Sequence, residues 1–165
     1  QFIACDKDAS NDIYCFRTDT TPAWVTPANN ILTTTTDTGI QRSFDINFEA
    51  STGNQAIAVY SDNTATPKLK KYDPSIGSSG TFDANATSLN ALGGVVKTVK
   101  TRPLFINDDI LVLLADANRR LYTIVWNGES NAVYTTPSGK AFTTQGTNGS
   151  AVTEFWFDFA WDNNY

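Results

Sequence analysis

Apolar and polar residues alternate along much of this chain, and elsewhere apolar residues gather in short blocks; both patterns predict β-strands. The clearest alternation lies in residues 153–162, where one face of the strand carries Phe155, Phe157, Phe159 and Trp161. Blocks such as 56–60 and 110–115 are bounded by polar residues. No segment combines helical periodicity with capping signals. We therefore expect an all-β fold.

The strand pattern repeats along the chain. Residues 57–62 match 111–116 at a shift of 111 − 57 = 54. Residues 44–49 return as 157–162 at a shift of 157 − 44 = 113, and residues 13–16 return 121 − 13 = 108 positions later. These shifts are all close to one or two lengths of 54 residues, so the chain consists of units of that length, of two alternating kinds.

A unit of this length with three or four strands has the size of a β-propeller blade. We expect about three blade-like antiparallel repeats in a single repeat domain, 1–165, as a β-propeller-like fold or a strand-exchanged β assembly. Its parts are a partial blade at 1–37, blades at 42–90 and 95–145, and the first strand of a further blade, or a donor strand, at 153–165. Three blades are too few to close a ring, because propellers contain about four to eight.

The last strand, 153–162, needs a partner, because its aromatic face would promote aggregation if it stayed exposed. We predict that it completes the open blade at the N-terminus of another copy, or joins the rest of a longer repeat chain. Strand addition of this kind closes a ring, for example from two copies, or produces a head-to-tail filament.

Two cysteines lie in the short strands predicted at 2–6 and 13–17. Antiparallel pairing about the turn at 7–12 places Cys5 directly opposite Cys15, within the range that a disulfide accepts. A disulfide here would fasten a terminal strand, and it implies an oxidising compartment.

Other features also favour an extracellular or cell-surface location. The charged fraction is 18%, below the roughly 25% typical of soluble domains, and Thr, Ser and Asn are abundant. Acceptor patterns for N-glycosylation occur at Asn85 and Asn148. The chain starts at Gln1 and shows no export signal, so we expect a processed product or a segment of a longer chain.

Charge and missing residue types exclude several classes of function. The formal charge, 12 − 17 = −5, opposes nucleic-acid binding. The absence of His excludes His-based catalytic triads and His-ligated zinc, and two Cys cannot form a four-thiolate metal site. The longest apolar run, 110–115, is too short to span a membrane. We expect no cofactor.

Acidic pairs are the catalytic candidates that remain. Asp108 and Asp109 are adjacent, so on a strand they would point to opposite faces, and we interpret them as the turn before a strand. Asp158 and Asp162 share a strand face at about 13 Å, too far apart for a glycosidase pair. The sequence therefore predicts no enzyme.

The N-terminal turn is a weak candidate for a calcium site. It offers oxygen ligands at Asp6, Asp8 and Asp12. The Gly and the Glu of a calcium loop are missing, and Arg17 stands where the Glu would be. A polar hairpin turn explains the same residues.

Aromatic side chains are candidates for stacking against a sugar ring. Trp24 lies in a Pro-flanked loop, where it either covers a blade edge or binds a ligand, and Tyr60 and Tyr72 are further candidates. Trp126 and Trp161 fall in apolar strand patterns, and we interpret both as core residues.

Several short motifs resemble a tandem repeat of large bacterial and archaeal surface proteins. The motifs are Leu32-Thr33-Thr34, Phe44-Asp45-Ile46-Asn47-Phe48-Glu49, Ala56-Ile57-Ala58-Val59-Tyr60, Pro67-Lys68-Leu69 and Val125-Trp126-Asn127-Gly128. The segment Lys71-Tyr72-Asp73-Pro74 departs from the Trp-Asn-Gly strand end of that repeat. The resemblance implies a propeller-like, extracellular protein for surface display or adhesion. Residues 117–128 are also similar to a repeat of six-bladed fungal lectins, which implies sugar binding.

The sequence thus favours one function and leaves one alternative. We expect a non-enzymatic structural or adhesive module of an extracellular surface that assembles into a filament or ring by β-strand complementation. Its partners would be other copies of itself or the rest of a longer repeat chain. The alternative is a carbohydrate-binding, lectin-like β-propeller whose partners are surface glycans.

Overall fold

The computed structural model describes residues 2–18, 23–37, 42–50, 55–105, 107–118, 120–128, 132–134 and 160. These residues contain thirteen strands and no helix, which confirms the all-β expectation. Accordingly, the described part of the chain offers no helix suited to crossing a membrane. The strands form three antiparallel sheets, and none of the sheets closes into a barrel.

Each sheet consists of strands that follow one another in the sequence. The first sheet contains β1 (Phe2–Lys7), β2 (Ile13–Thr18), β3 (Trp24–Val25) and β4 (Ile31–Thr33). The second contains β5 (Phe44–Phe48), β6 (Ala56–Tyr60), β7 (Lys68–Asp73), β8 (Thr81–Phe82) and β9 (Thr87–Ser88). The third contains β10 (Val96–Pro103), β11 (Ile110–Asp116), β12 (Leu121–Asn127) and β13 (Ala132–Tyr134). Each sheet falls within one expected repeat; that the sheets are propeller blades stays a prediction.

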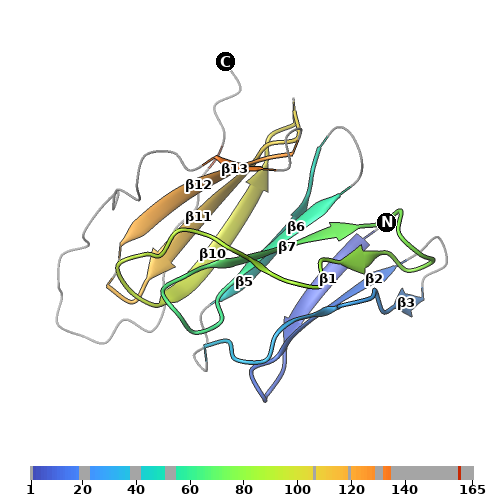
Figure 1. Ribbon diagram of the computed structural model, residues 1–165, viewed down its shortest axis with the longest axis horizontal. Coiled ribbons are helices and arrows are strands. Elements are labelled where there is room, and N and C mark those ends of the chain that lie inside the picture. The colour runs from blue at the N-terminus through green and yellow to red at the C-terminus, as the bar shows by residue number, and fades with distance from the viewer. Residues whose placement is uncertain are drawn as a thin grey trace.

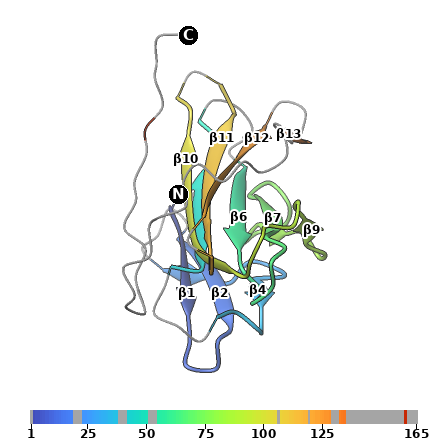
Figure 2. The ribbon, with the colours of Figure 1, turned by 90° about the vertical axis from the view of Figure 1, so that its left-hand side faces the viewer.

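The second sheet lies between the other two, as Figure 1 shows. Ile57 and Val59 of β6 pack into an apolar cluster with the third sheet, whereas Ala58 and Tyr60 pack into a second cluster with the first sheet. Both faces of β6 are therefore buried, which explains why its sequence is a continuous apolar run. In the view of Figure 2 the third sheet lies above and the β1–β2 hairpin points downward, away from it.

Polar side chains join the first strands of the second and third sheets. The backbone N–H of Thr101 in β10 donates to the carboxylate of Asp45 in β5 (2.7 Å). The side-chain amide of Asn47 donates to the carbonyl oxygen of Thr101 (2.9 Å). The Asp and Asn of the Phe44–Glu49 motif thus have structural roles, because they satisfy backbone groups of the neighbouring first strand.

The Trp126-Asn127-Gly128 motif is also structural. The indole N–H of Trp126 donates to Oε1 of Glu49 (3.0 Å), which links β12 to the end of β5. A Cβ at Gly128 would lie 2.5 Å from the backbone oxygen of Asp108. Only a residue without a side chain allows this close approach, which accounts for the glycine.

Glu49 gives a testable pH dependence. Burial raises the pKa of its carboxyl group, although the hydrogen bond from Trp126 acts in the opposite direction. Because the pKa of Glu49 is higher in the folded state than in the unfolded state, the protonated carboxyl group contributes to the free energy of unfolding. This contribution to stability is lost as the pH rises through the pKa that Glu49 has in the folded state. We expect Glu49→Gln to keep the hydrogen bond and to be more stable than the parent at pH 7, with the difference vanishing below about pH 4.

Urea unfolding at both pH values measures this difference. Glu49→Ala is the control, because it loses the bond to Trp126 and should be less stable than the parent at either pH. A constant difference between Glu49→Gln and the parent across the pH range would contradict the assignment.

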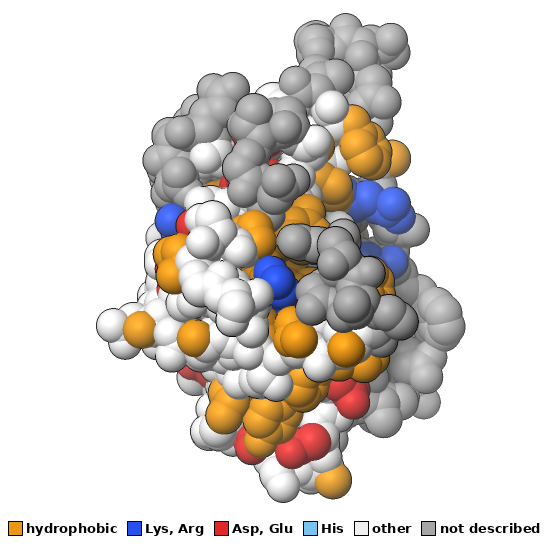
Figure 3. All heavy atoms as spheres, turned by 90° about the vertical axis from the view of Figure 1, so that its right-hand side faces the viewer, with side chains coloured by type: hydrophobic (Ala, Val, Ile, Leu, Met, Phe, Trp, Pro, Cys, Tyr) orange, Lys and Arg blue, Asp and Glu red, His pale blue; other side chains and the backbone are white. Residues whose placement is uncertain are grey.

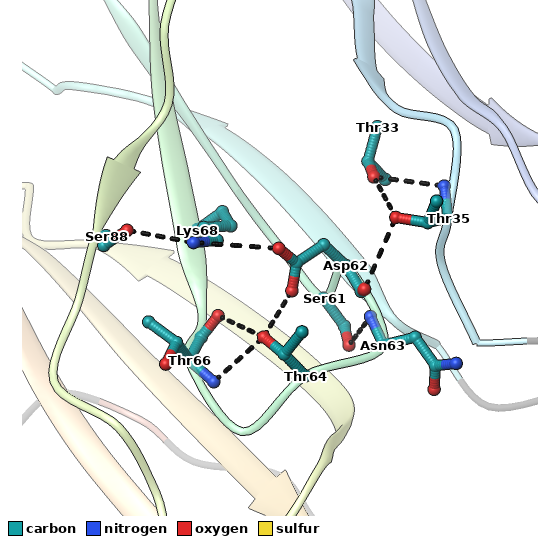
Figure 4. Close-up of polar contacts among 9 residues, drawn as sticks. All are labelled: Thr33, Thr35, Ser61, Asp62, Asn63, Thr64, Thr66, Lys68 and Ser88. Carbon is teal, nitrogen blue, oxygen red and sulfur yellow. Dashed lines mark hydrogen bonds and ion pairs between the residues drawn. The ribbon is translucent and has the colours of Figure 1, made fainter.

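Acidic residues shape the turns that join neighbouring strands. After β6, Asp62 accepts a hydrogen bond from Thr64 (2.5 Å) and lies 3.7 Å from the ammonium of Lys68 (Figure 4). Lys68 also donates to Ser88 (2.9 Å), and Thr35 donates to the carbonyl oxygen of Asp62 (3.4 Å). This network fastens the β6–β7 turn to the loop that follows the first sheet.

Candidate assembly site

The β1–β2 hairpin has the predicted register, with Cys5 opposite Cys15. The two residues form a disulfide with a Cα–Cα distance of 4.0 Å, which confirms the predicted pairing. In the turn, Oδ1 of Asp8 accepts the backbone N–H groups of Ser10 (2.8 Å) and Asp12 (2.9 Å). The disulfide and this turn hold the terminal strand β1 against β2.

The outer edge of β1 is open in the described part of the chain. There β1 pairs with β2 alone, whereas β6 pairs with both β5 and β7, and β11 pairs with both β10 and β12. The repeat makes β1 and β2 the counterparts of β11 and β12, so the counterpart of β10 is the strand that the first sheet lacks among the described residues. An open edge of this kind can accept a further strand.

The outward face of the first sheet is apolar. Phe2 is 58% exposed and Trp24 is 55% exposed, and their ring centroids lie 5.8 Å apart. A shallow pocket of about 370 Å³ beside them is lined by Ala4, Cys5, Asp6, Phe16 and Trp24. Figure 3 views the molecule from this side and shows hydrophobic side chains gathered in its lower part, next to acidic side chains.

The calcium candidates Asp6, Asp8 and Asp12 belong to the hairpin turn. Among the described residues, no group of three acidic or Cys side chains is arranged to hold a metal ion. Asp6 accepts the backbone N–H of Lys7 (2.8 Å). Asp12 accepts the hydroxyl of Tyr14 (2.9 Å), and this bond raises the pKa of Tyr14, because ionisation would break it beside a carboxylate. The three carboxylates thus act as hydrogen-bond acceptors within the hairpin.

The acidic pair Asp108 and Asp109 lies in the turn before β11, as predicted. Oδ1 of Asp109 accepts the side-chain amide of Asn127 (2.9 Å), and its backbone N–H donates to Asn107 (2.9 Å). Asp108 is buried. These contacts fix the turn to the end of β12. Asp108 and Asp109 therefore do not face a common solvent-filled site as a pair.

The structure corrects the expectation for two of the three stacking candidates. Tyr60 is 2% exposed and Tyr72 is 1% exposed, because both rings lie between the first and second sheets. Neither ring has a free face for a ligand. Trp24 is exposed on β3, where sugar stacking stays a prediction, and Trp126 is a core residue as expected.

Sequence reasoning missed two buried cations at the contact between the first and second sheets. Arg17 donates to the hydroxyl of Tyr72 (3.1 Å) and to the carbonyl oxygen of Ser78 (2.8 Å). Lys70 donates to the carbonyl oxygen of Ile31 (3.0 Å), and burial lowers its pKa. Both cations bind oxygens of the facing sheet or its loops, a non-local contact that alternation along a single strand does not reveal.

Several predicted residues lie outside the described part of the chain. They are the strand residues Phe155, Phe157, Phe159 and Trp161, the carboxylates Asp158 and Asp162, and the glycosylation candidate Asn148. The other glycosylation candidate, Asn85, is exposed between β8 and β9. Its modification stays a prediction.

The described residues define an all-β protein of three stacked antiparallel sheets with an open strand edge and an apolar outer face on the first sheet. No protein-family model, no curated protein and no solved structure matches the chain.

Proposed function

We propose that this chain is a non-enzymatic structural or adhesive module of an extracellular surface, and that it assembles by β-strand complementation at the edge of β1. The donor is the strand at 153–162 of another copy or of the rest of a longer repeat chain. The observation that carries the proposal is that the first sheet is incomplete among the described residues: there β1 pairs on one side, whereas its counterparts β6 and β11 pair on both sides.

The sequence of the donor segment supports this role. Its Phe157-Asp158-Phe159 matches Phe44-Asp45-Ile46 of β5, the first strand of the second sheet. In β5, Asp45 binds the backbone of the adjacent first strand β10, and Asp158 would be available for the same task. A strand of this type is what the first sheet lacks among the described residues. The disulfide, which holds the acceptor strand in place, supports an extracellular location.

Deletion of residues 153–165 tests the proposal. We expect the parent chain to form assemblies of several 18.0 kDa units, and the truncated chain to remain a monomer, because it keeps the acceptor edge and loses the donor. Size-exclusion chromatography with light scattering measures both masses. A monomeric parent, or a truncated chain that assembles like the parent, would show that strand complementation is wrong.

Sugar binding is the second candidate function, and the exposed Phe2–Trp24 pair favours it, because apolar ring faces of this kind accept pyranose rings. A glycan array on the parent and on Trp24→Ala distinguishes the two functions. Binding to a defined sugar that disappears in the variant would favour the lectin.

A further inference from the structure

The second sheet of this protein contacts a different neighbour on each of its two faces. In the second sheet, Ala58 and Tyr60 face the preceding sheet, and we call this side the front face. Ile57 and Val59 face the following sheet, and we call that side the back face. Two such contacts exist between the described sheets: the front face of the second sheet packs on the back face of the first, and the front face of the third packs on the back face of the second.

The repeat places equivalent residues of the third sheet on the same two faces. Ala58 corresponds to Val112, at 112 − 58 = 54, and Val112 packs against the second sheet. Ile57 corresponds to Leu111 by the same shift, and Leu111 points to the opposite side, because neighbouring strand residues alternate. Val125 lies opposite Leu111 on β12. Leu111 and Val125 are half-buried and Leu113 on the same face is buried, at 7% exposed, and none of the three belongs to the two apolar clusters between the described sheets.

In the first sheet it is the front face that no described sheet covers. Phe16 corresponds to Ile124, at 124 − 16 = 108, and Ile124 packs in the contact between the second and third sheets. The residue paired with Phe16 is Ala4, which places both on the same face. Phe2 and Trp24 extend this face, and both are more than half exposed. Among the described residues, the stack of three sheets therefore has an apolar front face at one side and a back face at the other.

We propose that the front face of the first sheet binds the back face of the third sheet in a second copy of this chain. The contact would repeat the packing that the chain already makes twice between its own sheets. The inference rests on the self-assembly in the proposed function, because both place a second copy at the first sheet. Such a contact joins two different surfaces, so it generates a closed ring or an open filament. Two copies would bring together six sheets, within the range of about four to eight in closed propellers.

The charges of the two faces are complementary. The front face of the first sheet is bordered by acidic residues of the hairpin, including the exposed Asp6. On the back face of the third sheet, Lys100 lies opposite Leu113 and Arg102 lies opposite Leu111, and both cations also have interactions within the chain. Opposite signs favour binding of front to back over binding of two front faces.

Two single substitutions test the arrangement. Trp24→Glu places a negative charge on the front face of the first sheet, and Leu111→Glu places a negative charge on the back face of the third sheet. Because both new charges are negative, the two altered faces repel each other. We expect each variant alone to be an 18.0 kDa monomer by light scattering, and an equimolar mixture to give particles of twice that mass. The mixture should stop at two chains, because it contains one intact front face and one intact back face per pair.

Controls separate loss of the contact from loss of the fold. Ile76→Glu changes a loop residue that is also about half exposed, at 54%, and it should assemble like the parent. Phe2→Glu and Val125→Glu repeat the test on each face, and an unchanged thermal midpoint shows that a variant is folded. Variants that assemble like the parent, or monomers whose mixture forms no pair, overturn the proposed contact.

The strand deletion described above distinguishes this contact from strand complementation. If the deletion gives monomers while both face variants assemble, the strand proposal stands and the face proposal is wrong. If both face variants are monomers while the deleted chain assembles, the face proposal stands and the strand proposal is wrong. A monomeric parent overturns both.

Discussion

Gly80→Ala should destabilise the protein by about 3 kcal/mol, because it combines backbone strain with a steric clash. Gly80 has a φ of +74°, in the left-handed region that residues with a side chain rarely adopt. A Cβ there would lie 2.1 Å from the hydroxyl oxygen of Tyr72. That ring cannot easily move, because it is 1% exposed and packs against Phe82 at 5.1 Å and Phe48 at 6.4 Å between centroids.

Gly77→Ala is the matched control for this prediction. Gly77 lies in the same turn with a φ of +71°, but nothing lies within 4 Å of the position of its Cβ. We expect Gly77→Ala to lose about 1 kcal/mol from the backbone conformation alone. Urea unfolding of both variants gives the difference, which isolates the clash with Tyr72. Equal losses in the two variants would contradict the close packing of Gly80 on Tyr72.

The sequence was sufficient for features set by local pairing. The hairpin around residues 7–12 placed Cys5 opposite Cys15, because a strand register follows directly from the centre of its turn. Asp108 and Asp109 were predicted to form a turn, because this polar pair directly precedes the apolar strand that begins at Ile110. On a strand the two side chains would point to opposite faces. The repeat of 54 residues also separated the sheets, since strands of one sheet follow one another in the chain.

Features set by contacts between sheets could not be predicted. Tyr60 and Tyr72 each combine an aromatic ring with a polar hydroxyl, so partial exposure was expected of both. Both are buried, because the second sheet lies between two others. Arg17 and Lys70 would ordinarily be placed at the surface, but both reach oxygens of a facing sheet or its loops. The exposed pair of Phe2 and Trp24 likewise depends on how β3 folds back onto β2. A single sequence contains no direct signal for such distant partners.

Removal of the disulfide, by Cys5→Ala together with Cys15→Ala, should lower the free energy of unfolding by about 3 kcal/mol, as expected for a cross-link that closes a short loop. The bond joins residues 10 positions apart. Among the described residues β1 pairs with β2 alone, so no second strand holds it in register once the cross-link is gone. Urea unfolding of the double variant and the parent, both under oxidising conditions, measures the loss.

A reducing agent supplies the control, because it should lower the stability of the parent to that of the double variant and leave the variant unchanged. The same treatment connects stability to assembly. Fraying of β1 would remove Ile3 from the contact with the second sheet, and would disorder both the open edge and the face that carries Phe2. We therefore expect reduction to dissociate the assemblies of the parent at urea concentrations that leave the oxidised assemblies intact. Assemblies that resist reduction would show that assembly does not depend on the disulfide.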